Sequence, residues 1–128
     1  MLSYDAYNSF CRALPATNHV VQWGGAHVWK VVPKVFAMAG WSKKKLPFIP
    51  FKCSGTAFEI LHDRPGLRPA PYLAPRGGKW IQMHGPPGLD DDAMKAYLTE
   101  SHKLVSLKLT RKLQAELGLN QSDPNGYE

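Results

Sequence analysis

The sequence is short of cysteine and has no long apolar run, and each shortage excludes a class of protein. Cys11 and Cys53 are its only two cysteines, and they lack CxxC spacing. We therefore expect two buried thiols in a reducing compartment rather than a disulfide. No apolar segment approaches the roughly 18 residues of a membrane-spanning helix. The N-terminal MLSYDAYNSF has neither the basic start nor the apolar stretch of a secretory signal, which favours a cytoplasmic protein.

Catalytic motifs are also absent. The five histidines are scattered, without the HExxH or zinc-ligand spacing of a metal site, so we expect no metal and no cofactor. Gly77 to Lys79 resembles a phosphate loop only in its GGK, because Trp80 stands where a Ser or Thr would hold magnesium. No GxSxG occurs, and Ser101 and His102 are neighbours that point about 100° apart on a helix. The sequence therefore predicts a protein without catalytic activity.

Acidic residues are missing from long parts of this basic chain, which has a net charge of +6. There is none between Asp5 and Glu59 or between Asp63 and Asp90. The separation predicts a basic face if the fold gathers these segments, whereas the alternative is that scattered lysines only keep strands and loops soluble. The basic residues of the two acid-free segments are Arg12, Lys30, Lys34, Lys43, Lys44, Lys45, Lys52, Arg64, Arg68, Arg76 and Lys79.

The first two thirds of the chain predict a helix and several strands. Ser3 to Leu14 has helical apolar spacing, with Ser3 as N-cap and Pro15 beyond its end. The β-branched and aromatic segments HVVQW, AHVWKVV, KVFAMAGW, PFIPFKC and KWIQMH predict strands, the first three forming an antiparallel meander. Pro50 favours an edge or a bulge for the fourth strand. Where Lys30 follows Trp29 and Lys79 precedes Trp80, we expect the tryptophan in the core and the lysine on the opposite face.

A short helix, TAFEILHD, follows Ser54, and the last third of the chain is helical. Asp90 is the expected N-cap of a helix from Asp91 to about Ser106. The apolar stripe then slips, which predicts a break near residues 107–110 and a short helix capped by Thr110 and closed by Gly118. With 44% hydrophobic residues, the 128-residue chain predicts one folded domain over residues 1–118 and a polar tail over residues 119–128.

The order of these pieces resembles the MmcQ/YjbR family of small bacterial proteins. The likeness extends from about Phe10 to Leu117, and its most specific parts are RPAPYLA followed by KWI and the segment from Ser101 to Val105 with its trailing Lys and Arg. Family members usually carry Tyr where this chain has His102. The resemblance implies an α+β fold, an antiparallel sheet flanked by an N-terminal helix and C-terminal helices in a double-wing arrangement. It also implies DNA binding, the usual description of such proteins, with no established catalytic residues.

We therefore predict a monomeric module that binds double-stranded DNA through its phosphates. The alternative is an interaction module for an acidic protein or a small anionic ligand. A continuous basic face would favour nucleic acid, and a basic rim around a pocket would favour a ligand. The candidate phosphate contacts lie on a wing-like loop (Lys43, Lys44 and Lys45), before the last strand (Arg76 and Lys79) and at the C-terminal end (Lys108, Arg111 and Lys112).

Overall fold

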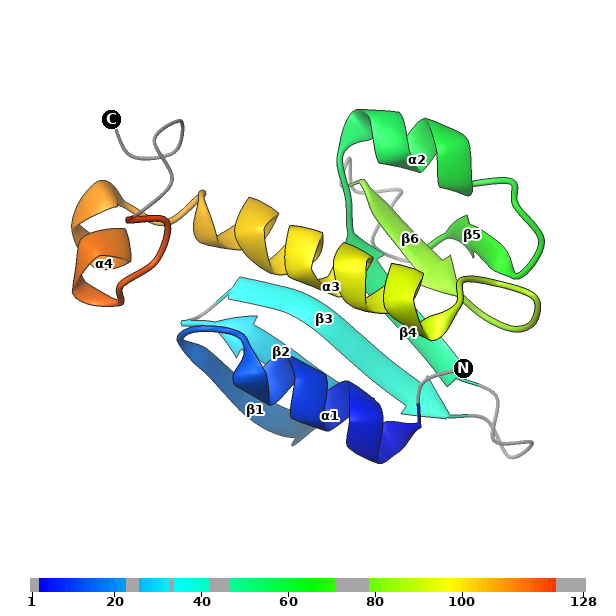
Figure 1. The fold of residues 1–128 in the computed structure, drawn as a ribbon, viewed down its shortest axis with the longest axis horizontal. Coiled ribbons are helices and arrows are strands. Elements are labelled where there is room, and N and C mark those ends of the chain that lie inside the picture. The colour runs from blue at the N-terminus through cyan, green and yellow to red at the C-terminus, as the bar shows by residue number, and fades with distance from the viewer. Residues whose placement is uncertain (1–2, 23–25, 33, 42–46, 71–78, 122–128) are drawn as a thin grey trace.

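A six-stranded antiparallel sheet in the order β1-β2-β3-β4-β6-β5 forms the centre of the protein (Figure 1). The computed structural model describes residues 3–22, 26–32, 34–41, 47–70 and 79–121. This is the expected α+β fold, a single domain with one N-terminal helix and two C-terminal helices. The elements are α1 (Tyr4–Ala13), β1 (Thr17–Gln22), β2 (Ala26–Val31), β3 (Lys34–Trp41), β4 (Pro47–Lys52), α2 (Gly55–Leu61), β5 (Leu67–Pro69), β6 (Trp80–Met83), α3 (Asp91–Ser106) and α4 (Arg111–Glu116).

The predicted helix caps are confirmed. Side-chain oxygens of Ser3, Ser54, Asp90 and Thr110 each accept a hydrogen bond from the backbone N–H three residues further on. Each bond satisfies one of the free N–H groups at a helix start, which fixes where the helix begins. The break after Ser106 is also confirmed. The short strand β5 was not predicted, because its proline-rich sequence lacks the usual strand composition.

The prediction that Pro50 marks an edge strand or a bulge is wrong, because β4 is an inner strand and its register with β3 does not shift across Pro50. Strand β4 is flanked by β3 on one side and β6 on the other. The pairing with β3 joins Phe51 to Ala37 and Phe48 to Gly40 and passes over Pro50. A proline has no N–H to donate, so the sheet accommodates it in an inner strand at a place where the ladder is interrupted.

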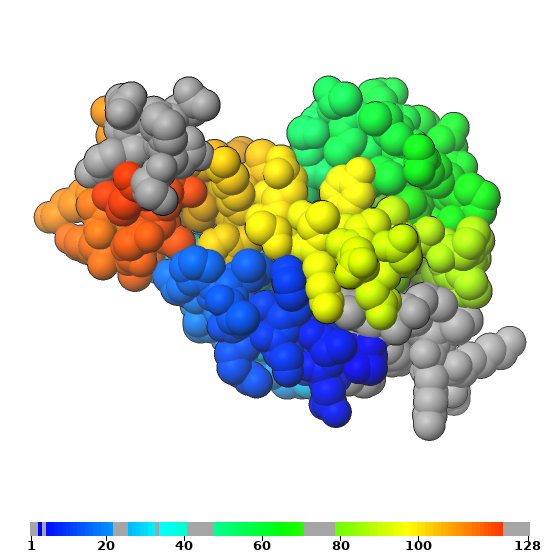
Figure 2. Space-filling model, in the orientation of Figure 1, coloured from blue at the N-terminus to red at the C-terminus, as the bar shows by residue number. Residues whose placement is uncertain are grey.

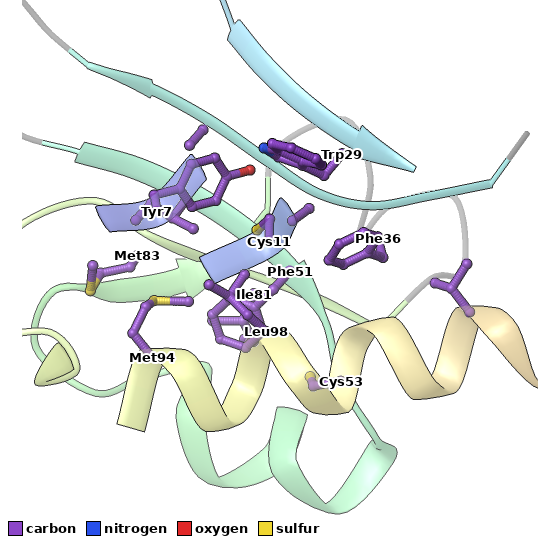
Figure 3. Packing of buried hydrophobic residues seen from close by; sticks show 14 of the residues in the cluster. Tyr7, Cys11, Trp29, Phe36, Phe51, Cys53, Ile81, Met83, Met94 and Leu98 are labelled. Carbon is purple, nitrogen blue, oxygen red and sulfur yellow. The ribbon is translucent and has the colours of Figure 1, made fainter. Parts of the chain in front are cut away.

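Helices α1 and α3 cover one face of the sheet, so that little of β2 and β3 is visible from that side (Figure 2). In the core between them, Tyr7 and Cys11 of α1 and Met94 and Leu98 of α3 are fully buried (Figure 3). Leu119 joins this core, one residue beyond Gly118, where we placed the end of the domain. Residues 122–128 of the predicted tail lie outside the described residues.

The two tryptophans expected in the core differ. Trp29 is buried, and its indole N–H donates to Asn8 Oδ1 at 2.9 Å, which ties β2 to α1. Trp80 is only half-buried. Its prediction as a core residue is therefore wrong, because Ile81 and Met83 occupy the buried positions of β6 and strand alternation places Trp80 on the other face.

A β-bulge lies near the start of β3. Lys30 of β2 pairs with Val35 and Trp29 pairs with Ala37, so Phe36 is an extra residue between them. Both Phe36 and Ala37 are fully buried although they are consecutive. The bulge thus turns the large Phe36 ring toward the helices, where it packs edge-on against the ring of His102 at 5.2 Å.

The hydroxyl of Ser101 on α3 completes the sheet beside this bulge. Extending the β3–β4 pairing one residue beyond Ala37 and Phe51 would bring Phe36 opposite Lys52. Instead, Ser101 Oγ donates to the Phe36 carbonyl oxygen at 2.6 Å and accepts from the Lys52 backbone N–H at 2.9 Å. A fully buried side chain therefore stands in place of a ladder bond and ties α3 to two strands at once.

We expect Ser101→Ala to lower the free energy of unfolding by about 2–4 kcal/mol, because each buried group left unsatisfied costs about 1–3 kcal/mol. Urea unfolding followed by circular dichroism measures the difference. Thr99→Ala is the matched control on the same helix, since the exposed Thr99 hydroxyl only donates to the Lys95 carbonyl oxygen. That variant should lie within about 0.5 kcal/mol of the wild type, and equal losses in the two variants would contradict a bridging role for Ser101.

Candidate anion-binding site

Three strand ends meet at one end of the sheet. Antiparallel neighbours place the start of one strand beside the end of the next, so the start of β3 at Lys34 lies near the end of β4 at Lys52. The start of β6 adjoins the same point, because Trp80 pairs with Lys52. Topology alone thus brings together two lysines and a tryptophan from separate segments.

Helix α3 adds a third lysine to this place. It crosses the sheet over β3 and β4 (Figure 1), and its C-terminal end carries Val105 and the following turn, which contains Lys108. The result is a surface hollow of about 210 Å³, which we call the lysine hollow. It is lined by Lys34, Val35, Lys52, Trp80, Val105 and Lys108.

Among the described residues, the lining of the lysine hollow carries three amines and no acidic side chain. Partial burial lowers the pKa of Lys52, and contact with Lys108 and repulsion from Lys108 and Lys34 lower it further. Like charges held close together disfavour the protonated form. An anion bound among them would relieve this repulsion, so the arrangement is suited to receiving negative charge.

The turn that carries Lys108 is held by its own hydrogen bonds. Gln114, a buried residue of α4, donates through Nε2 to the Leu109 carbonyl oxygen at 2.8 Å. Asn120 donates to Gln114 Oε1 at 2.8 Å and to Ser106 Oγ at 3.2 Å. The backbone on both sides of Lys108 is therefore fixed by buried or half-buried polar contacts.

The other predicted phosphate contacts are distributed unevenly. Lys79 is exposed immediately before Trp80, with its Nζ 5.0 Å from the centre of the Phe58 ring. Arg111 and Lys112 are exposed in the first turn of α4, where cations do not stabilise the helix dipole. Of the predicted residues that the structure describes, only Lys108 lines the lysine hollow. Lys43, Lys44, Lys45 and Arg76 lie outside the described residues.

Lys34 and Lys52 were not in the predicted set, although both lie in the acid-free segment of the sequence. Their proximity depends on strand pairing, which brings residues 18 positions apart to one place. A signal was nevertheless present, because an antiparallel meander requires the start of KVFAMAGW to lie beside the end of PFIPFKC if the two strands pair. Trp80 also lines the lysine hollow, although strand alternation had predicted it in the core.

A larger hollow of about 410 Å³ lies between the end of α1, α3 and the residues after α4. Its main polar groups are already occupied within the protein. His102 donates through Nε2 to the Pro15 carbonyl oxygen at 2.8 Å, and burial lowers the pKa of its ring, an effect that this bond partly offsets. Asn120, also in its lining, makes the bonds to Gln114 and Ser106. We therefore regard this hollow as structural.

The two buried cysteines are unreactive, and two strand histidines contact each other. Both cysteines are free and buried, as predicted, and burial raises the pKa of Cys11 to about 12 and that of Cys53 to about 11. They are thiols at neutral pH, not nucleophilic thiolates. His19 and His27 lie on the α1 side of the sheet, with His19 Nε2 3.0 Å from His27 Nδ1. Among the described residues, no three His, Cys, Asp or Glu side chains group as metal ligands.

We expect Lys108→Met to raise the pKa of Lys52 toward its ordinary value. Removing the neighbouring amine removes both a contact and a repulsion that disfavour the charged form. The rise is partial, because burial is the larger cause and persists. A pH titration of the Lys52 side chain by NMR measures the change. Lys95→Met, on the N-terminal half of α3, removes the same charge and should leave the titration of Lys52 unaltered. A titration that is identical in the wild type and Lys108→Met would contradict the coupling.

Comparison with known proteins agrees with this architecture. Protein DR2400 of Deinococcus radiodurans, whose crystal structure contains the DUF419 domain, superimposes with a TM-score of 0.81. The alignment covers 100% of this chain and 96% of that one at 21% sequence identity, which establishes a shared fold. None of the curated proteins matches the sequence. In the part of the chain that the structure describes, no helix is long and apolar enough to cross a membrane. Residues 12–104 match the family model described as YjbR, and the chain belongs to the YjbR family.

Proposed function

We propose that the protein binds nucleic acid, with double-stranded DNA as the expected form, through phosphate contacts at the end of the molecule that carries the lysine hollow. The observation that supports this most strongly is the convergence of Lys34, Lys52 and Lys108 on one hollow, whose described lining contains no acidic residue. Phosphate contacts hold a protein on a nucleic acid without reading its sequence. The activity is binding alone, without catalysis.

The exposed charges near the lysine hollow favour a polymer. Lys79 immediately precedes Trp80 in the sequence, while Arg111 and Lys112 follow Lys108 by three and four residues. Because they are exposed and close in sequence to lining residues, they add three positive charges near the hollow. A polyanion can contact several of them at once and release its counterions, which makes such binding salt-dependent. The net charge of +6 adds a general attraction that speeds association.

A small anionic ligand is the second candidate, and the lysine hollow itself favours it. Its basic lining fulfils the criterion of cations placed around a concave site. The described structure contains no comparable feature for an acidic protein partner, whose binding would require a broader complementary surface. We therefore retain nucleic acid as the main proposal.

Fluorescence anisotropy with a labelled random-sequence duplex, measured over a series of salt concentrations, tests this function. We expect saturable binding whose logarithm falls linearly with the logarithm of salt concentration. The double variant Arg111→Gln, Lys112→Gln should bind more weakly, and its salt slope should fall by up to about 1.8, at roughly 0.9 per lost phosphate contact. Both residues are exposed and outside the lysine hollow, so the fold should be preserved.

The matched control is Arg64→Gln, Lys95→Gln, which removes the same charge elsewhere on the surface. Its salt slope should equal that of the wild type. A third variant, Lys43, Lys44 and Lys45→Ala, tests the wing-like loop predicted from the sequence. Absence of duplex binding at low salt would overturn the proposed function. Equal losses of affinity in the two double variants would mean that Arg111 and Lys112 act only through the net charge of the protein.

A further inference from the structure

The charge of the lysine hollow is greater than one phosphodiester needs. Three amines line the same hollow, whereas each phosphodiester of a nucleic acid backbone carries one negative charge. A phosphate attached through a single ester bond carries about −1.5 to −2 at neutral pH and offers three strong acceptor oxygens. Three ammonium groups can each donate to one of these oxygens. Both the charge and the number of donors therefore match a phosphomonoester better than a diester.

The size and walls of the lysine hollow fit the same ligand class. Its volume of about 210 Å³ corresponds to about seven water molecules at roughly 30 Å³ each. That is room for a phosphate group and the first atoms of its organic substituent. Val35, Val105 and the indole of Trp80 supply apolar wall beside the lysines. A sugar or base attached to the phosphate can pack against Trp80, as bases do on aromatic side chains.

We propose that the lysine hollow binds a phosphomonoester dianion, with the ammonium groups of Lys34, Lys52 and Lys108 on its oxygens and Trp80 beside its organic substituent. The dianion has two sources of identical chemistry, the terminal phosphate of a nucleic acid strand and a small phosphorylated molecule. The first source rests on the proposed function, and the second does not require it. The lowered pKa of Lys52 is consistent with a site awaiting an anion, because bound negative charge would restore its protonated form.

Titration with inorganic phosphate tests the site directly. At about pH 7.5 the phosphate is mainly a dianion, and NMR follows the indole N–H of Trp80 and the backbone amides around the lysine hollow. We expect saturable shifts confined to these signals. Lys52→Met should weaken binding by about tenfold or more, the loss expected for one charge-assisted hydrogen bond. Lys108→Met should do the same, so the test does not depend on the folding of one variant.

Lys95→Met is the control that loses the same charge outside the lysine hollow and should bind phosphate as the wild type does. Dimethyl phosphate, a diester with a single charge, is the second control and should bind several-fold more weakly at equal ionic strength. Equal affinity for phosphate and dimethyl phosphate, or unchanged phosphate binding in both hollow variants, would overturn the proposal. So would shifts spread over all basic surfaces.

Duplexes with 5′-phosphate or 5′-hydroxyl ends distinguish the two sources. Tighter binding of the phosphorylated end, lost in Lys52→Met, would assign the site to nucleic acid termini. Phosphate binding without a preference for that end would assign it to a small phosphorylated molecule. Salt-dependent duplex binding without any phosphate binding would overturn the dianion site and leave the proposed function intact. Phosphate binding without duplex binding would support the dianion site and overturn the proposed nucleic acid binding.

Discussion

The hydroxyl of Ser101 is the contact on which both the sheet and the candidate site depend. It stands between the carbonyl group of Phe36 and the N–H of Lys52, where a backbone ladder bond would otherwise form. Both strands use it as a shared partner, so β3 and β4 remain joined beyond their last regular pair while their ends are held apart. The same residue anchors the C-terminal half of α3 to the sheet. Lys108 can therefore line the same hollow as Lys34 and Lys52 because one buried hydroxyl fixes the helix to both strands.

This arrangement places repulsive charges on a well-packed support. Two ammonium groups about 4 Å apart repel by about 1 kcal/mol in water and by several times that near a protein surface. A fully buried aromatic or aliphatic side chain contributes about 1.5–3 kcal/mol, and the neighbouring core contains Phe36, Phe51 and Ile81. Burial of these side chains helps to offset the repulsion. An anion bound among the lysines would be favoured by the loss of this repulsion, which is present only in the free protein.

Local sequence signals predicted the elements, and non-local pairing decided the site. The helix starts could be predicted from the N-cap residues Ser3, Asp90 and Thr110, because capping involves residues only three positions apart. Pro50 was wrongly predicted to mark an edge or a bulge, because the sequence does not show that the β3–β4 ladder is interrupted at that residue. Strand β5 was missed because its pairing with β6, and not its composition, makes it a strand. Lys108 was predicted from the charge of its own segment. The other two lysines of the hollow, Lys34 and Lys52, were not predicted as site residues, because the order of charges along the chain does not show which strand ends meet. Trp80 was assigned to the wrong face, because Ile81 and Met83 rather than Trp80 occupy the buried positions of β6.

The affinity of such a site depends on how much order its lysines must gain on binding. Lysine side chains are flexible, and fixing each one costs about 0.5–1.5 kcal/mol. This entropy cost is smaller where the backbone that carries the lysine is already held in place. Lys52 is half-buried at the end of a strand bonded to Ser101, and Lys108 lies in a turn that Gln114 and Asn120 hold from the other side. Lys34 is exposed and has the most freedom. We therefore expect Lys52 and Lys108 to contribute more than Lys34 to the affinity for a single phosphate group. Arg111 and Lys112, outside the lysine hollow, act through the longer-range attraction that a polymer can exploit.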